Sequence, residues 1–419
     1  MFEEYFSRRL DLPKRAMPKL YNFWDIICYT FAMDEIEELL TRGVANIIPN
    51  KEELKKLLAA GKKLNVYLGI DPTATKIHLG NAVVLRKLSK FAKLGHNVTF
   101  LIGDFTALIG DTSDKDSERP TLTTAEIQEN FKTYKKQAEK ILDFSKIKVR
   151  YNSEWLNKLS FPEIIKLAQQ FSFGDFGSRE LIKKRLNASK HVGLHEGLYP
   201  VAQGYDSYFL DTDIQIGGTD QTFNMQAGRI LQKNWRNKES FIIATEFLMG
   251  TDGRKMSKSW GNAIWLDDNP QDMYAKIMAI KDDLIDQYFT LATNTDLKKI
   301  KEIESGKNPM AVKKELAKII VTELHSEKDA EDAAENFKRI VQNKEAPEDV
   351  LSISVSDGLT INDVLIKVKL AGSISEGKRL IKQGGVKLNN ENIADPNSKI
   401  KEGTLSVGKR RFVKIKITK

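Results

Sequence analysis

The sequence is poor in cysteine and histidine: its 419 residues include one cysteine, Cys28, and five histidines. A single cysteine excludes an internal disulfide, and this composition provides no Cys-rich zinc site. The sequence also lacks any run of about 18 apolar residues, the length that a membrane-spanning helix needs. We therefore expect a soluble protein of the reducing cytoplasm, without a membrane span and without a metal site of its own.

Net positive charge is absent from most of the chain and concentrated at its end. Residues 361–419 contain 14 Lys or Arg against 5 Asp or Glu, an excess of +9 that equals the net charge of the whole chain. The rest of the chain is therefore neutral overall. A compact basic segment beside a neutral body is typical of an appended RNA-binding module.

Two lysines three positions apart, Lys255 and Lys258, stand in a segment that we call the lysine loop (residues 250–262). Gly250 and Gly253 precede them and favour a turn. Such a cationic hairpin can close over a triphosphate and stabilise the charge of a departing pyrophosphate. A loop of lysine and serine taken alone is more often solvated surface, so this interpretation depends on other segments.

A second phosphate-binding pattern lies far upstream, in residues 68–81. There an apolar strand runs into a turn and then into an amphipathic helix. The N-terminus of a helix that follows such a turn binds anions. His78 lies at this junction, and together with the lysine loop it is expected to be functional rather than only structural.

The two patterns together resemble the HIGH and KMSKS signatures of class I aminoacyl-tRNA synthetases. The first corresponds to residues 78–81 and the second to residues 255–259. The resemblance implies that His78 donates to the triphosphate and that Gly80 lets the adenine approach the backbone. Asn81 stands where the signature has a second histidine, and its amide can also donate to phosphate or ribose oxygens.

The segment 198–206 resembles the tyrosine-binding helix of tyrosyl-tRNA synthetases. Tyr199, Gln203 and Asp206 recur at steps of four and three, so their side chains project from one face of a helix. The resemblance implies that Asp206 and Tyr67 contact the substrate phenol, and that Tyr199 and Gln203 hold its ammonium group. Such a site rejects phenylalanine by roughly four to five powers of ten, because its polar groups are left unpaired.

Two further loops fit the family pattern. Residues 215–221 are expected to follow a short strand and open a helix, with Gly217 and Gly218 close to the nucleotide. Asp220 would bind the ribose hydroxyls, and Gln221 would face the reacting carboxylate.

The other loop, residues 108–113, resembles the family's loop whose acidic residue meets the substrate amine, here Asp111. Thr112 takes the place of a proline common in the family. Lys115 and Arg119 match mobile basic positions that reach the pyrophosphate.

The resemblance thus implies three sets of site residues. The catalytic residues are His78, Lys255, Lys258, Lys115 and Arg119. The tyrosine-binding residues are Tyr67, Asp71, Asp111, Tyr199, Gln203, Asp206 and Gln221. The ATP-binding residues are Thr73, His78, Gly80, Asn81, Gly217, Gly218, Asp220 and Lys258.

The activity that follows from this resemblance is tyrosine activation in two steps. The tyrosine carboxylate attacks the α-phosphorus of ATP, and the terminal ribose of tRNA(Tyr) then attacks the tyrosyl-adenylate. Mg²⁺ is expected to arrive with the nucleotide. A homodimer is expected from the resemblance alone.

The rest of the sequence predicts the domain organisation. Alternating strands and helices in residues 33–262 favour a Rossmann-like, doubly wound parallel sheet within an α/β catalytic domain. Residues 263–343 are expected to form an α-helical domain and residues 344–358 a linker. Residues 359–419, with two short helices and strands near 386–389 and 411–417, resemble the small α+β S4 RNA-binding domain.

Residues 1–32 are the least explained part of the chain. Their four acidic residues argue against a mitochondrial presequence. We expect either a start site placed too early or a lineage-specific extension.

Three alternatives remain open at this point. A tryptophanyl-tRNA synthetase of the same fold is disfavoured by the phenol-matching Tyr67 and Asp206. A small-molecule nucleotidylyltransferase would have little use for a basic RNA module. A non-catalytic RNA-binding relative should have lost His78 or the lysine loop, and both are present.

Overall fold

The computed structural model describes residues 33–111, 123–305, 308–342, 351–389, 391–408 and 411–418. Its described residues divide into two compact units, the first within Met1–Asp268 and Ile280–Pro309 and the second within Asn269–Ala279 and Met310–Lys419. The expectations for residues 1–32, Thr112, Lys115 and Arg119 lie outside the described residues. Within the described ranges, no helix is long and apolar enough to cross a membrane.

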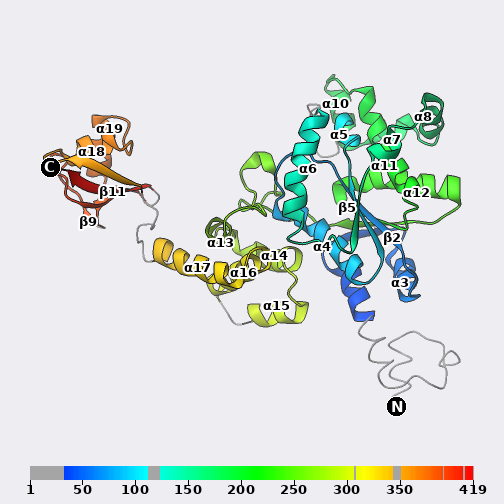
Figure 1. The fold of residues 1–419 in the computed structure, drawn as a ribbon, viewed down its shortest axis with the longest axis horizontal. Coiled ribbons are helices and arrows are strands. Elements are labelled where there is room, and N and C mark those ends of the chain that lie inside the picture. Colours follow the sequence, from blue (N-terminus) through cyan, green and yellow to red (C-terminus); the bar gives the residue numbers. More distant parts are fainter. Residues whose placement is uncertain are drawn as a thin grey trace, which may run out of the picture. The chain divides into compact units, whose positions relative to one another are not determined.

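The first unit is built on a six-stranded sheet with the order β1-β6-β5-β2-β3-β4 (Figure 1). The strands are β1 (Val44–Ile48), β2 (Asn65–Ile70), β3 (Asn97–Ile102), β4 (Ile147–Tyr151), β5 (Ile214–Gly218) and β6 (Phe241–Thr245). All neighbours pair in parallel except β1, which is antiparallel to β6. The predicted doubly wound parallel sheet is confirmed. The carboxyl ends of β2 and β5 meet where the strand order reverses, which is where such sheets bind ligands.

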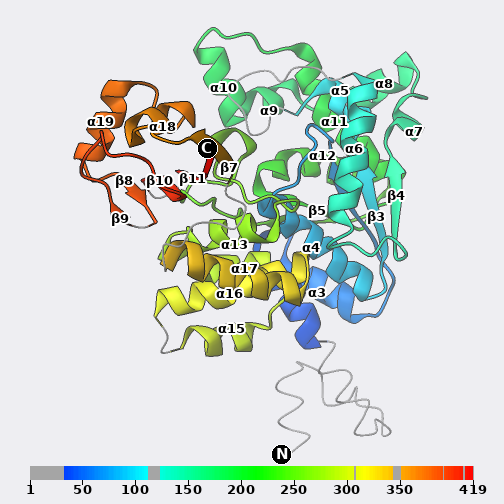
Figure 2. The same cartoon turned by 60° about the vertical axis from the view of Figure 1, so that its left-hand side comes forward.

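Helices cover both faces of this sheet (Figures 1 and 2). On one face α4 (Leu79–Lys93) packs against β2, β3 and β5 and buries Leu85, Leu88 and Phe91 completely. On the other face α11 (Leu194–Phe209) and α12 (Thr222–Arg236) pack together. Further helices of this unit are α3 (Lys51–Ala59), α5 (Thr106–Ile109), α6 (Thr124–Ala138), α7 (Ser153–Leu156), α8 (Phe161–Ala168), α9 (Phe173–Ser178), α10 (Glu180–Asn187) and a helix that includes residues 33–41.

The predicted boundary after residue 262 differs from the observed division. Two helices that the sequence assigns to the helical domain, α14 (Ile285–Ala292) and α15 (Leu297–Glu304), belong to the first unit. The reason is packing, because α14 lies against α4 and buries Tyr288 and Phe289 completely. A helical pattern in the sequence does not reveal which neighbour a helix packs on.

Among its described residues, the second unit contains three helices followed by a small sheet with two further helices. The first three helices are α13 (Pro270–Met278), α16 (Pro309–Leu324) and α17 (Glu327–Phe337), which continues as η4 (Lys338–Gln342). α13 packs on α17, with the Tyr274 and Phe337 ring centroids 5.6 Å apart. Strands are absent from the described part of residues 270–343, as the sequence predicts.

The sheet of the second unit has the order β7-β11-β10-β8-β9. Its strands are β7 (Ser352–Ser356), β8 (Val386–Leu388), β9 (Glu391–Asn392), β10 (Gly403–Val407) and β11 (Arg411–Thr418), and its helices are α18 (Ile361–Lys367) and α19 (Ile374–Lys382). The linker prediction for residues 344–358 is wrong at β7, which pairs in parallel with β11. Serines alternate with Ile353 and Val355 there, so only one face is apolar, and Val355 is fully buried.

Candidate active site

The candidate site forms where β2 and β5 end side by side. Asp71 follows the last residue of β2, and Gly217 and Gly218 are the last residues of β5. The sequence predicts a loop over residues 215–221, but the strand continues through Gly218, and a 3-10 turn, η1 (Thr219–Gln221), leads into α12. Polar residues on these turns therefore converge on one edge of the sheet.

His78 is the N-cap of α4, and its side chain is nearly buried, with 8% exposed. Its Nδ1 accepts a hydrogen bond from the backbone N–H of Asn81 over 3.2 Å, and the Asn81 side-chain oxygen accepts one from the backbone N–H of His78 over 3.3 Å. This reciprocal capping box gives Asn81 a structural role. It also places the proton of the neutral ring on Nε2, where it can be donated outward.

The protonation of His78 is set by its surroundings. Burial, together with the positive charges of Lys258 and Lys255, lowers the pKa of His78 to about 4. The ring is therefore neutral near pH 7, and it acts as a hydrogen-bond donor and not as a third positive charge.

The structure brings the two signatures together. A Cβ placed on Gly80 would lie 3.6 Å from the Cβ of Met256 in the lysine loop. Gly80 therefore lies beside that loop, and a side chain there would first crowd the His78 ring, whose Nδ1 would be 3.0 Å from the added Cβ. Residues 78–81 and 255–259 therefore lie close together, and the lysine charges of the second segment act on His78.

The lysine loop is a hairpin held by its own last residue. Met249 and Lys255 pair as an antiparallel bridge, and the Gly250 N–H donates to the Arg254 carbonyl over 2.7 Å. Asn262, 2% exposed, accepts from the Ser257 N–H over 2.9 Å and donates to the Asp252 carboxylate over 2.8 Å. That bond, with help from Arg254, lowers the pKa of Asp252 to about 2.

The two lysines of the loop point to different partners. The Lys255 ammonium lies 3.2 Å from the Asp220 carboxylate and 3.6 Å from the ring centroid of Phe247. The Lys258 ammonium donates to the hydroxyl of Tyr134, on α6, over 3.4 Å. Lys255 is thus placed beside the turn after β5, and Lys258 beside α6.

Three of the predicted tyrosine-binding residues, Tyr199, Gln203 and Asp206, lie on α11 as their spacing predicts. Tyr199 is 8% exposed and Asp206 is 2% exposed, with the half-buried Gln203 between them. The two carboxylate oxygens of Asp206 accept hydrogen bonds from Trp155 Nε1 over 2.7 Å and from Asn152 Nδ2 over 3.1 Å. Both partners come from the end of β4 and the helix after it.

A second carboxylate joins this cluster through a threonine. The Thr106 hydroxyl accepts from Asn152 Nδ2 over 3.1 Å and donates to Asp71 over 2.7 Å. The Tyr199 hydroxyl donates to the other Asp71 oxygen over 2.8 Å. Asp71 and Asp206 are therefore linked by a continuous chain of hydrogen bonds, which we call the carboxylate cluster (Asp71, Thr106, Asn152, Trp155, Asp206).

Burial governs the charge of this cluster. Burial raises the pKa of Asp206 to about 8, against the opposing effect of the hydrogen bonds from Asn152 and Trp155. Burial and the charge of Asp206 also raise the pKa of Tyr67 well above its usual value. Tyr67 therefore stays protonated, and its hydroxyl donates to Gln215 over 3.1 Å.

Asp111 and Gln221 contact each other within the site. Gln221 Nε2 donates to Asp111 over 2.7 Å, although the residues are far apart in sequence. Thr73 lies in the turn between β2 and α4, where its N–H donates to the Asp71 carbonyl over 2.8 Å. Lys115 and Arg119 lie outside the described residues, so their predicted roles stay predictions.

Some site residues were not predicted from the sequence. They are Thr106, Asn152, Trp155, Gln215, Tyr134 and, as a brace for the loop, Asn262. One signal was available, because Asn152 directly follows a strand of the parallel sheet and so lies at the edge that binds ligands. For Tyr134 and Trp155 the sequence offers only aromatic residues with helical spacing, which usually means core packing.

Comparison with known proteins matches two families on this chain. The model for "tRNA synthetases class I (W and Y)" matches residues 59–342, and that for the S4 domain matches residues 361–405. The chain is 45% identical over 405 residues to the tyrosine–tRNA ligase of Carboxydothermus hydrogenoformans, covering 91% of this chain and 98% of that protein. It is 41% identical to the tyrosine–tRNA ligase of Thermotoga maritima, with 91% and 97% covered.

Among solved structures, the fold is similar to a C-terminally truncated mitochondrial tyrosyl-tRNA synthetase of Aspergillus nidulans. The TM-score is 0.63 at 20% identity, covering 74% of this chain and 98% of the other. The Archaeoglobus fulgidus tyrosyl-tRNA synthetase, solved with L-tyrosine, gives a TM-score of 0.56 at 23% identity, with 72% and 99% covered. These likenesses concern the fold.

Proposed function

The chain belongs to the tyrosine–tRNA ligases, within the class I tRNA synthetases (W and Y), and from this premise we propose how its residues carry out the reaction. The enzyme activates L-tyrosine with ATP and transfers it to tRNA(Tyr). The observation that carries our assignment is the carboxylate of Asp206, buried and held on both oxygens, close to the edge where His78 and the two lysines meet.

Tyrosine is recognised by the carboxylate cluster and the residues around it. Asp206 accepts a hydrogen bond from the substrate phenol, and Tyr67 shares that contact. Tyr199, Gln203, Asp71 and Asp111 surround the ammonium group, which needs negative charge and acceptors. Phenylalanine would leave buried polar atoms without partners, and this loss of hydrogen bonding is the basis of selectivity.

Activation proceeds by in-line displacement at the α-phosphorus of ATP. A carboxylate oxygen of tyrosine forms the new P–O bond while the bond to the β-phosphate oxygen breaks, which releases pyrophosphate. The neutral His78 donates through Nε2, and Lys255 and Lys258 stabilise the charge that develops on the leaving group. Gln221 orients the attacking carboxylate, and Asp220 accepts from the ribose hydroxyls.

Lys115 and Arg119 are expected to assist the departure of pyrophosphate. Gly80, Asn81, Thr73, Gly217 and Gly218 line the nucleotide. A Cβ on Gly218 would lie 2.6 Å from an oxygen of Asp220, so a side chain there would displace the group assigned to the ribose.

Mg²⁺ fits this site as an ion that binds together with the nucleotide. Among the described residues, no group of three or more His, Cys, Asp or Glu side chains is placed to hold a metal ion. The nearby Asp71, Asp111 and Asp220 already accept hydrogen bonds from protein side chains. Bound to phosphate oxygens and water, Mg²⁺ would neutralise part of the triphosphate charge.

Transfer to tRNA uses the adenylate without a covalent enzyme intermediate. A hydroxyl of the 3′-terminal ribose attacks the tyrosyl carbonyl, the bond to the phosphate oxygen breaks, and AMP leaves. The proton passes to a substrate oxygen. The S4 domain supplies the basic surface for tRNA, with Lys378, Arg379 and Lys382 on α19 and Lys414 and Lys416 on β11.

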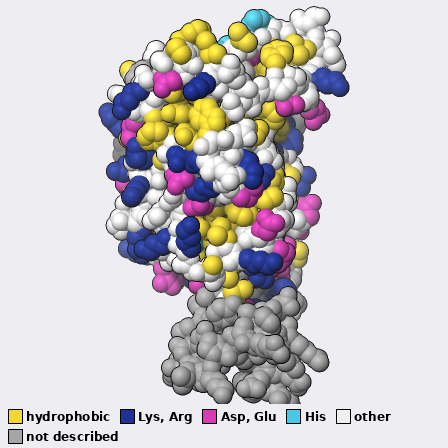
Figure 3. Space-filling view, turned by 90° about the vertical axis from the view of Figure 1, so that its right-hand side faces the viewer, with side chains coloured by type: hydrophobic (Ala, Val, Ile, Leu, Met, Phe, Trp, Pro, Cys, Tyr) yellow, Lys and Arg dark blue, Asp and Glu magenta, His cyan; other side chains and the backbone are white. Residues whose placement is uncertain are grey.

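The proposed homodimer is supported by exposed apolar side chains on the first unit. Most large exposed hydrophobic side chains of that unit lie on α5 and α8 to α11: Leu108, Phe161, Ile165, Phe173, Leu186, Leu194, Leu198 and Phe209. Figure 3 shows hydrophobic side chains gathered on that side of the molecule. Patches of this kind mark protein interfaces. Sedimentation should give a dimer for the parent and a monomer for Leu194→Glu, whose parent side chain is 78% exposed.

ATP–pyrophosphate exchange with tyrosine, phenylalanine and tryptophan supplied separately tests the proposed function. Exchange with tyrosine alone, followed by charging of tRNA(Tyr), is the expected result. Exchange with tryptophan would overturn the assignment of Asp206 and Tyr67. No exchange with any of the three would overturn the catalytic assignment. We also propose the cytoplasm as the site of action, which cell fractionation can test.

A further inference from the structure

The lysine loop follows a short stretch of backbone, residues 247–249, that is hydrogen-bonded to helix α14. Gln287 on α14 uses both ends of its amide for this purpose. Its Oε1 accepts from the Met249 N–H over 3.1 Å, and its Nε2 donates to the Phe247 carbonyl over 3.2 Å. A side-chain amide thus pairs with this backbone as a neighbouring strand would.

The next residue of α14 adds a third hydrogen bond. The hydroxyl of Tyr288, a fully buried side chain, donates to the Met249 carbonyl over 2.8 Å. Burial raises the pKa of Tyr288 above its usual range, so the hydroxyl keeps its proton. The N–H and the carbonyl of Met249 are therefore both held by α14.

The hairpin connects these hydrogen-bonded residues to Lys255. Met249 pairs with Lys255, and the Met256 N–H donates to the Leu248 carbonyl over 3.0 Å. The ring of Phe247, whose carbonyl Gln287 holds, lies 3.6 Å from the Lys255 ammonium. Any shift of residues 247–249 along α14 would move this ammonium with them.

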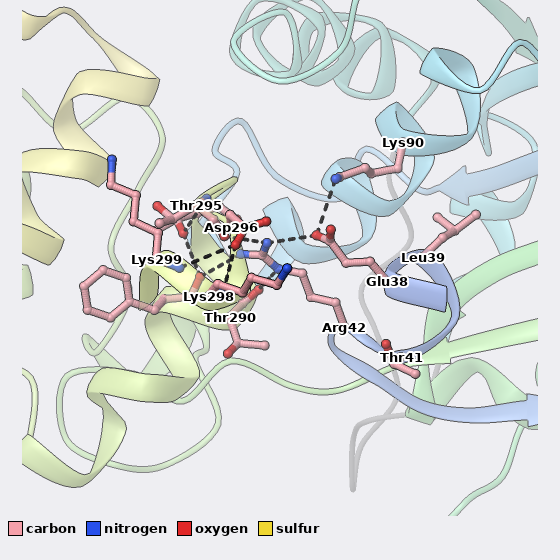
Figure 4. Close-up of polar contacts among 12 residues, drawn as sticks. Glu38, Leu39, Thr41, Arg42, Lys90, Thr290, Thr295, Asp296, Lys298 and Lys299 are labelled. Atoms are coloured by element: carbon pink, nitrogen blue, oxygen red, sulfur yellow. Dashed lines mark hydrogen bonds and ion pairs between the residues drawn. The ribbon is translucent and has the colours of Figure 1, made fainter. Parts of the chain in front are cut away.

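The C-terminal end of α14 is itself fixed by one arginine. The Arg42 guanidinium donates to four carbonyl oxygens, those of Phe289, Thr290, Thr293 and Thr295, over 2.7 to 3.0 Å (Figure 4). A guanidinium is well suited to this task because its donors form a rigid planar fork. It satisfies carbonyls at a helix end that have no partner within the helix.

The Arg42 junction also includes α4, the helix that begins after His78. Glu38 accepts from Arg42 over 3.1 Å and from Lys90 of α4 over 3.4 Å (Figure 4). Lys87 of α4 donates to the Leu39 and Arg42 carbonyls, each over 2.7 Å. The same junction therefore holds the helix that carries His78 and the helix that holds the stem of the lysine loop.

We propose that Gln287 and Tyr288 are positioning residues for tyrosine activation, which act through Lys255, and that Arg42 holds their helix in register with α4. The inference rests on the proposed function, because it takes Lys255 to stabilise the leaving pyrophosphate. Neither Gln287 nor Tyr288 touches the carboxylate cluster. Their hydrogen bonds should therefore affect the activation rate and leave tyrosine binding unaffected.

The test is pre-steady-state formation of tyrosyl-adenylate by the full-length protein, with tyrosine affinity measured separately. Tyr288→Phe removes one oxygen atom and one hydrogen bond, and it should slow activation about fivefold. Gln287→Leu removes two hydrogen bonds and should slow activation about thirtyfold. The KM for tyrosine should stay at the parent value in both variants.

Three controls separate positioning from general damage. Tyr274→Phe removes the phenol hydroxyl of another buried tyrosine, which lies in the second unit and is 2% exposed, and it should leave activation unchanged. Arg42→Lys keeps the charge near Glu38 but loses the planar fork, and it should slow activation like Gln287→Leu. Adding Tyr288→Phe to Lys255→Ala should have no further effect, because the lysine that it positions is gone.

The outcomes are distinguishable. If the parent forms no tyrosyl-adenylate, the proposed function fails. If the parent is active but Lys255→Ala activates tyrosine at the parent rate, the catalytic role of Lys255 fails, and the inference fails with it. Suppose that the parent is active and Lys255→Ala is impaired. The inference is then overturned if Tyr288→Phe and Gln287→Leu activate tyrosine at the parent rate. It is also overturned if Tyr288→Phe slows activation as much in the Lys255→Ala background as in the parent. Should Gln287→Leu or Arg42→Lys fail to fold, Tyr288→Phe decides alone, since it leaves the packing nearly intact.

Discussion

Replacing Asp206 by asparagine should weaken the discrimination between tyrosine and phenylalanine without changing the size of the side chain. In the parent, both carboxylate oxygens accept hydrogen bonds, from Trp155 and from Asn152. The amide of Asp206→Asn must turn its NH₂ toward one of these donors. Asn152 cannot simply flip to compensate, because its Oδ1 already accepts from the Phe105 N–H over 2.9 Å.

The magnitude is worked for a pH above the Asp206 pKa of about 8, where the parent provides a charged acceptor and Asp206→Asn does not. A hydrogen bond to a charged group contributes about 1.5 to 3 kcal/mol, and a neutral one about 1 kcal/mol. The ratio of kcat/KM for tyrosine over phenylalanine should therefore fall by roughly tenfold to a hundredfold in Asp206→Asn. The assay is ATP–pyrophosphate exchange with each amino acid. Asp213→Asn, which changes a carboxylate beside Lys238 at the start of β5, is the matched control.

The same substitution should change how stability depends on pH. The Asp206 pKa is about 8 in the folded protein, against a usual value of 3.8, so between these limits the folded state holds the extra proton. The free energy of unfolding of the parent should then fall relative to Asp206→Asn as the pH rises from about 4 to about 8. The slope is at most about 1.4 kcal/mol per pH unit. Parallel stability curves for the two proteins, or an unchanged tyrosine preference, would refute the reasoning.

Other predictions concern the rest of the site. Lys258→Ala should slow adenylate formation about a hundredfold or more while tyrosine binding survives, as equilibrium dialysis and rapid quench can show. Because the His78 pKa is about 4, activation at saturating tyrosine should show no inflection near pH 6.5, and one there would contradict a neutral ring. Asn81→Ala removes half of a capping box and should lower the free energy of unfolding by about 1 kcal/mol in chemical denaturation. Lys414→Glu with Lys416→Glu should weaken tRNA charging and its dependence on salt, whereas equal loss of pyrophosphate exchange would point to misfolding.

The local elements of the site could be predicted because their chemistry depends on near neighbours. The strand, turn and helix around His78 follow from residues 68–81, and helical spacing alone places Tyr199 and Asp206 on one face. The parallel sheet follows from alternating strands and helices. The basic S4 domain is visible in the charge count of the last residues.

The pairing of distant residues could not be predicted in this way. Trp155 and Asp206 are 51 positions apart, and Arg42 and Phe289 are 247 apart, so no periodic pattern links them. Even β7 was misassigned, because strands on a small sheet with one polar face resemble a serine-rich linker in composition.

The sequence by itself indicated which residues we expect to take part in tyrosine activation, and it predicted the helix on which Tyr199 and Asp206 lie. Only the tertiary structure decided which donors hold Asp206, why its carboxyl favours a proton, and that α14 holds the stem of the lysine loop. The physical reason is that helix and strand periodicities depend on residues a few positions apart, whereas burial and hydrogen-bond partners depend on how elements pack.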